Sequence, residues 1–120
     1  MAGGCETIVV HCMDYRLQTY LNHWLESNLP IKSYDLCSIA GGVYDVYDVI
    51  RQVDLAYRLH HIQKVIFINH EDCGAYGFES SDERHEADLR KAREKINLLF
   101  PSLKVELYFL NLDGTFEDID

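Results

Sequence analysis

Strand-like apolar runs alternate along this chain with segments whose apolar residues recur at helical spacing. The runs cover residues 7–10, 34–39, 64–69 and 104–110. The helical stripes consist of Leu17, Tyr20, Leu21, Trp24 and Leu25, then of Val46, Val49, Ile50, Val53 and Tyr57, and then of Leu89, Ala92, Ile96 and Leu99. This alternation predicts a three-layer α/β fold, in which a four-stranded, mainly parallel sheet is flanked by helices.

Proline, capping and turn residues mark the ends of these elements. Pro30 follows the first helical stripe, in a position that is typical of a helix end. Ser80 and Glu83 have the spacing of a capping box, so we expect the third helix to begin after Ser80. Asp113-Gly114 is a turn signal, which predicts that residues 115–116 fold back as a short edge strand at the C-terminus.

Three residues that can bind a soft metal follow two of the apolar runs. Cys12 comes after the run at 7–10, and His70 and Cys73 come after the run at 64–69. Ligands gather outside the carboxyl ends of neighbouring parallel strands, so we expect the three side chains to lie close together. Thiolate and imidazole are preferred zinc ligands, and three protein ligands leave a fourth position for water. The sequence therefore predicts a metal site, with Zn²⁺ as the expected ion.

A carboxylate and a guanidinium stand directly after the first of these ligands. Asp14 and Arg16 are two residues apart, which suits a charge-assisted ion pair. Beside a metal ligand, such a pair can orient a metal-bound water. The Asp14 carboxylate is also close enough in sequence to bind the metal itself, and the residues alone allow both roles.

Composition narrows the classes of function. A chain of 120 residues, 48% of them hydrophobic, suits one domain over residues 1–120. The net charge is -9, with 11 Lys and Arg against 20 Asp and Glu, which argues against a nucleic-acid partner. No apolar run approaches the roughly 20 residues that span a bilayer, so we expect a cytoplasmic protein with no membrane partner. In that compartment the four cysteines are expected to be metal ligands or free thiols.

Two motifs carry a resemblance to a known family. Cys12-x-Asp14-x-Arg16 and His70-x-x-Cys73-Gly74, with Ala40-Gly41-Gly42 between them, resemble the β-class carbonic anhydrases from about residue 7 to the C-terminus. The resemblance is to a small, N-terminally short member of that family. It implies that Cys12, His70 and Cys73 hold zinc. It also implies that Asp14 and Arg16 form a catalytic pair, that Asp14 becomes the fourth ligand in a closed state, and that the chain assembles as a homodimer or a higher homo-oligomer.

The activity that the resemblance implies is the reversible hydration of carbon dioxide to bicarbonate by a zinc-bound hydroxide. One alternative is a relative that acts on a similar small electrophile, such as carbon disulfide or carbonyl sulfide. A second is a non-catalytic zinc-binding domain in which Asp14 closes the metal site. A third is a thiol enzyme with Cys12 as its nucleophile near Arg16, although the residues between them offer too few backbone amides for the anion-binding loop of such enzymes.

The remaining histidines and several tyrosines carry weaker predictions. His11 and His85 could relay protons, but we expect His85 to be an ordinary surface histidine. Strand alternation predicts that the ring of His11 turns away from the metal ligand beside it. Tyr44, Tyr47 and Tyr76 are candidate exposed aromatic residues at a dimer surface, although simple packing is the commoner role of such residues.

Overall fold

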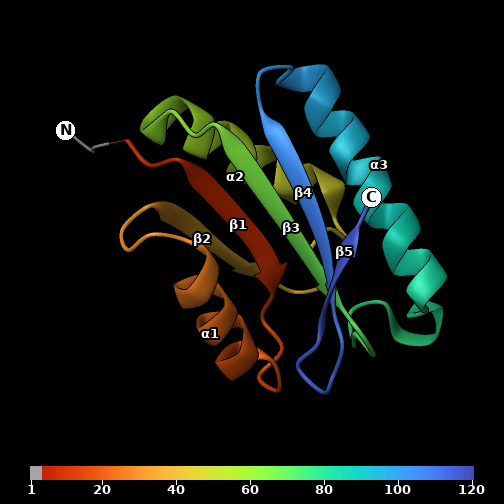
Figure 1. The fold of residues 1–120 in the computed structure, drawn as a ribbon. Coiled ribbons are helices and arrows are strands. Elements are labelled where there is room, and N and C mark those ends of the chain that lie inside the picture. The colour runs from red at the N-terminus through yellow and green to blue at the C-terminus, as the bar shows by residue number, and fades with distance from the viewer. Residues whose placement is uncertain (1–3) are drawn as a thin grey trace.

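A five-stranded sheet forms the middle layer of the computed structural model, which describes residues 4–120 (Figure 1). Its strand order is β2-β1-β3-β4-β5, and the first four of these strands are parallel while β5 is antiparallel to β4. The strands are β1 (Thr7–Cys12), β2 (Tyr34–Ile39), β3 (Lys64–His70), β4 (Lys104–Leu110) and β5 (Phe116–Ile119). The predicted mainly parallel sheet is confirmed, and the predicted short edge strand is a fifth strand of four residues.

Helices cover both faces of this sheet (Figure 1). The helix α1 (Gln18–Asn28) packs on one face, and α2 (Val46–His60) and α3 (Asp82–Leu99) pack on the other. Alternate residues of β1 face opposite sides of the sheet. Val9 packs in the cluster under α1, and Val10 packs in the cluster under α2 and α3. The predicted three-layer α/β architecture is therefore confirmed.

The register of the parallel strands brings the predicted ligands to one edge. In the pairing of β1 with β3, Thr7 lies opposite Lys64 and His11 lies opposite Ile68. The two strands therefore end beside each other, and Cys12 leaves β1 next to the end of β3. This is the edge at which parallel sheets place their ligand sites.

The start of α3 differs from the prediction. The capping residue is Ser81, whose hydroxyl oxygen accepts the N–H of Arg84 at 3.1 Å. The capping box predicted from Ser80 and Glu83 is wrong, because Ser80 ends the preceding 3-10 turn, η1 (Gly77–Glu79), and its hydroxyl turns inward. None of the helices within residues 4–120 has the length and apolar character that a membrane span requires.

Asp45 begins α2, and its replacement tests the contribution of this cap. Its carboxylate accepts the N–H groups of Tyr47 and Asp48 at 3.1 and 3.3 Å. We expect Asp45→Ala to lower the free energy of unfolding by about 1 kcal/mol, because two backbone donors lose their partner. Urea denaturation measures the change. The control is Asp54→Ala on the same helix, which loses only an exposed ion pair with Arg58, and equal losses in the two variants would contradict the capping role.

Candidate metal site

Cys12, His70 and Cys73 converge at the edge of the sheet where β1 and β3 end. Their ligand atoms all lie within 4.8 Å of one another, and each side chain is buried. Cys12 and His70 are the last residues of their strands, and Cys73 lies in the turn that follows His70. Two thiols and one imidazole in this arrangement could hold a metal ion.

The ring of His70 is oriented for this role. Its Nδ1 lies 2.7 Å from the backbone oxygen of Glu71 and donates a hydrogen bond to it. The lone pair is therefore on Nε2. Among the buried side-chain nitrogen and oxygen atoms of residues 4–120, this atom alone has no hydrogen-bond partner. A buried polar atom without a partner is costly, and a metal ion would remove that cost.

A glycine turn after β2 supports Cys12. The N–H of Gly41 donates to Cys12 Sγ at 3.3 Å. Gly41 and Gly42 both have positive φ angles, of 83° and 60°, which side chains disfavour. A Cβ on Gly42 would also lie 2.5 Å from Asn69 Oδ1. Hydrogen bonding by Cys73 and then by His70 holds the pKa of Cys12 well below its usual range, despite burial.

Asp14 and Arg16 form an ion pair beside the three candidate ligands. Arg16 Nη2 lies 2.7 Å from Asp14 Oδ2, and Arg16 Nε lies 3.1 Å from Asp14 Oδ1. The guanidinium also donates to the backbone oxygen of Asp72 at 2.8 Å and pairs with the Asp72 carboxylate at 3.2 Å. Arg16 therefore connects the loop after β1 with the loop that carries Cys73.

The Asp14 carboxylate is ionised and close to the candidate ligands. Its Oδ2 lies 3.9 Å from His70 Nε2. Hydrogen bonds from Arg16 lower the pKa of Asp14 to about 2. A fixed carboxylate is thus positioned to act on a molecule bound next to His70.

Asn69, directly before His70 in β3, is the centre of a buried network behind the candidate ligands. Its Oδ1 accepts the N–H of Val43 at 3.1 Å. Its Nδ2 donates to the hydroxyl of Tyr76 at 3.0 Å and to Nδ1 of His85 at 2.9 Å. One side chain therefore joins the turn after β2, the strand β3 and the helix α3.

His85 extends this network to the loop that carries Cys73. Its Nδ1 accepts from the amide of Asn69, so the neutral ring carries its proton on Nε2 and donates it to Ser80 Oγ at 2.9 Å. Ser80 Oγ also accepts the N–H of Cys73 at 2.9 Å. Burial lowers the pKa of His85 to about 4, which keeps the ring neutral at physiological pH.

The structure corrects two predictions about surface residues. His85 is 1% exposed and Tyr76 is 4% exposed, so neither is a surface side chain. The ring of Tyr76 packs between Tyr44 and His85, at centroid distances of 4.6 and 4.2 Å. Tyr44 and Tyr47 are exposed as predicted, whereas His11 is buried with Nδ1 2.8 Å from the backbone oxygen of Cys12.

Sequence reasoning missed the supporting network of Asn69, Ser80 and His85. A signal was present for Asn69, because it is a polar residue within the apolar run at 64–69. No comparable signal marked Ser80 or His85 as members of this network, since each lies in a polar segment of the sequence.

A comparison with known families agrees with this geometry. A family model described as "Putative carbonic anhydrase" matches residues 2–120. The chain belongs to this family. It is also 28% identical over 132 residues to an uncharacterized protein of Rickettsia conorii, an alignment that covers 94% of this chain and 71% of the relative.

Solved structures of two carbonic anhydrases and a carbon disulfide hydrolase share the fold of this family member. A carbonic anhydrase from Glaciozyma antarctica matches with a TM-score of 0.75 at 19% identity, over 100% of this chain and 85% of that one. A carbon disulfide hydrolase in its apo form matches with a TM-score of 0.72 at 13% identity, over 100% and 81%. One of two tetrameric β-carbonic anhydrases from Sordaria macrospora matches with a TM-score of 0.63 at 14% identity, over 98% and 82%. These similarities show a common fold.

The buried network predicts a dependence of stability on pH. The pKa of His85 is lowered from 6.5 to about 4, so between these pH values the unfolded chain binds a proton that the folded chain does not. The free energy of unfolding therefore decreases as the pH falls through this window, by up to about 1.4 kcal/mol per pH unit. Urea denaturation at several pH values, with a chelator present, measures the slope.

We expect His85→Gln to have a smaller slope than the wild type over the same window. A chelator in every sample removes any contribution from metal release at low pH. The control is His23→Gln on the exposed face of α1, which should keep the wild-type slope. Identical slopes in the wild type and in His85→Gln would contradict this origin of the pH dependence.

Proposed function

We propose that this chain is a zinc-dependent carbonate dehydratase, in which residues 1–120 act as one domain that hydrates carbon dioxide reversibly to bicarbonate. The proposal rests on the position of Asp14, whose Oδ2 lies 3.9 Å from His70 Nε2 while Arg16 binds both of its carboxylate oxygens. A metal site with a purely structural role does not need an ionised carboxylate fixed beside its ligands. Membership of the carbonic anhydrase family supports the same activity.

The candidate ligands suit zinc. Two cysteines and one histidine are a common catalytic donor set for this ion, and His70 offers a buried lone pair with no partner among the described residues. The N–H of Gly41 stabilises negative charge on Cys12, as a zinc-bound thiolate requires. When bound, zinc lowers the pKa of a coordinated water to about 7 and so supplies a nucleophile at neutral pH.

Asp14 and Arg16 have different tasks in this proposal. Asp14 accepts a hydrogen bond from the reacting water, which directs a lone pair of the water oxygen toward carbon dioxide. Arg16 keeps Asp14 ionised, so the carboxylate can only accept this hydrogen bond and cannot donate one. Asp72 holds Arg16 from the opposite loop and thereby limits the movement of the pair.

The same contacts favour the enzyme over a non-catalytic zinc domain. In the latter, Asp14 would leave Arg16 and bind the metal as a fourth ligand. That movement would break the 2.7 Å contact with Arg16 Nη2 and the hydrogen bonds to both carboxylate oxygens. Because Asp14 is held in the ion pair, we favour the open, catalytic form.

We further propose that the enzyme works as a homo-oligomer in the cytoplasm. The strand β2 is an edge of the sheet, and its Leu36 is 49% exposed. An unpaired edge with an exposed apolar side chain favours association with a second copy. The four cysteines form no disulfide, which suits a reducing compartment.

Removal of a candidate ligand tests the assignment of zinc. We expect Cys73→Ser and His70→Ala each to lose one equivalent of zinc per chain and to unfold at a lower temperature, because metal-binding free energy is also folding free energy. Elemental analysis and thermal denaturation measure the two effects. Cys37→Ser is the matched control, since this half-buried thiol lies outside the candidate site. Unchanged zinc content in both ligand variants would refute the assignment.

The role of Asp14 is tested by stopped-flow hydration of carbon dioxide between about pH 7 and pH 9. We expect the zinc-loaded wild type to turn over faster as the pH rises, because the reacting water must lose a proton. Asp14→Ala should retain its zinc and lose about 100-fold in kcat. Asp118→Ala, which removes an exposed carboxylate of β5, is the control.

Two outcomes of this experiment would contradict the proposal. Equal turnover in Asp14→Ala and the wild type would refute the orienting role of the carboxylate. An inactive wild type with zinc in place would refute carbon dioxide hydration, and a subsequent assay with carbon disulfide and carbonyl sulfide would then separate a related hydrolase from a non-catalytic domain.

A further inference from the structure

A second group of metal-ligating side chains lies at the opposite end of the sheet. Cys5, Asp35 and His60 offer a thiol, a carboxylate and an imidazole whose ligand atoms all lie within 4.8 Å of one another. All three side chains are partly buried. The group shares no residue with the site at the ends of β1 and β3, and the proposed hydration reaction makes no use of it.

Three separate segments bring this group together. Cys5 precedes β1, and its N–H donates to the backbone oxygen of His60, the last residue of α2, at 3.0 Å. Asp35 lies near the start of β2, opposite Ile8 of β1. The side chains therefore meet where the chain enters β1 and β2 and where α2 ends.

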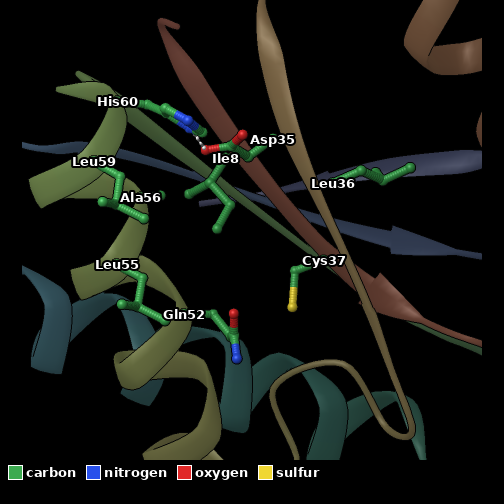
Figure 2. A pocket seen from close by; sticks show the side chains of 9 residues that line it. All are labelled: Ile8, Asp35, Leu36, Cys37, Gln52, Leu55, Ala56, Leu59 and His60. Carbon is green, nitrogen blue, oxygen red and sulfur yellow. Dashed lines mark hydrogen bonds and ion pairs between the residues drawn. The ribbon is translucent and has the colours of Figure 1, made fainter. Parts of the chain in front are cut away.

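The strongest contact within the group is between Asp35 and His60. Asp35 Oδ2 lies 2.7 Å from His60 Nδ1, and Figure 2 shows the two side chains facing each other at one end of a groove. Burial, followed by the charge of Asp35, raises the pKa of the Cys5 thiol. The thiol therefore stays protonated, and Cys5 Sγ donates to the backbone oxygen of Thr7 at 3.6 Å.

The charge and donor chemistry of the group suit a divalent cation. A thiolate, a carboxylate and a neutral imidazole carry two negative charges together, which one divalent ion balances. The mixture of sulfur, nitrogen and oxygen donors suits borderline-soft ions such as Zn²⁺ and Co²⁺ better than Mg²⁺ or Ca²⁺, which prefer oxygen donors alone.

The group is also accessible from solvent. The side chains of His60 and Asp35 are 29% and 31% exposed. They border a groove of about 390 Å³ between β2 and α2, into which Cys37 and Gln52 also project (Figure 2). A hydrated ion can reach Asp35 and His60 through this groove and keep a water as its remaining ligand.

We propose that Cys5, Asp35 and His60 form a second zinc-type site that is separate from the site of Cys12, His70 and Cys73. A bound ion would replace the proton of the Cys5 thiol and the Asp35–His60 hydrogen bond with three metal bonds. It would join the entry to β1, the start of β2 and the end of α2. This inference does not depend on the proposed enzymatic activity.

The test counts zinc on the folded protein with a matched pair of cysteine variants. At equilibrium in dialysis against a fixed concentration of free Zn²⁺, the wild type should bind two zinc ions per chain. Cys5→Ser should carry one. Cys37→Ser should still carry two, because Cys37 is a partly buried thiol that lines the same groove without belonging to the ligand group.

Cobalt spectroscopy separates the two sites. Titration of the zinc-free wild type with Co²⁺ should give two phases of thiolate-to-cobalt charge-transfer absorption. Cys5→Ser should lose one phase, and Cys73→Ser should lose the other. His60→Gln keeps the Cys5 thiol and should weaken the Cys5-dependent phase by about tenfold or more. Circular dichroism of each variant verifies that it is folded.

The proposal is overturned if folded Cys5→Ser binds as many zinc ions as the wild type. It is also overturned if His60→Gln binds cobalt with wild-type affinity in both phases. In either case Asp35 and His60 form a hydrogen-bonded pair only. If Cys5→Ser fails to fold, the His60→Gln titration decides the question by itself.

Discussion

The parallel pairing of β1 with β3 is the constraint on which the candidate site depends. Its register ends the two strands side by side, so Cys12 and His70 meet although 57 residues separate them in the sequence. The turn after β3 then returns Cys73 to the same place. A shift of register by one residue would reverse which face each side chain occupies, and it would also exchange core residues with site residues. The hydrophobic core therefore protects the geometry of the site.

Two sets of polar contacts stabilise the loops that this pairing brings together. On the exposed side, Arg16 binds Asp14 and Asp72, which belong to the two loops. On the buried side, Asn69 and His85 connect the glycine turn after β2 to the backbone of Cys73 through Ser80. Buried polar groups that are fully paired specify one arrangement, because any other leaves a donor or an acceptor unsatisfied. The candidate ligands are thus preorganised before a metal binds.

The two ends of the sheet differ in what they offer a cation. At the carboxyl ends of β1 and β3, two thiols and a histidine are buried, and an ionised carboxylate stands beside them. At the other end, Cys5, Asp35 and His60 are partly exposed, and Asp35 and His60 border a groove. The first arrangement suits an ion that is held permanently and acts on a small molecule, whereas the second suits an ion that exchanges with solvent and joins three chain segments.

The sequence by itself determined the succession of strands and helices along the chain and the fold class, and it predicted the five residues of the candidate site, since hydrophobic period and motif spacing are local properties. It did not determine that His85 and Tyr76 are buried, that Ser81 caps α3, or that Asn69 links three elements. It also gave no sign that Cys5, Asp35 and His60 meet, because they belong to no common motif. Only the tertiary structure decided these points, because burial and contact between distant residues depend on how the layers pack.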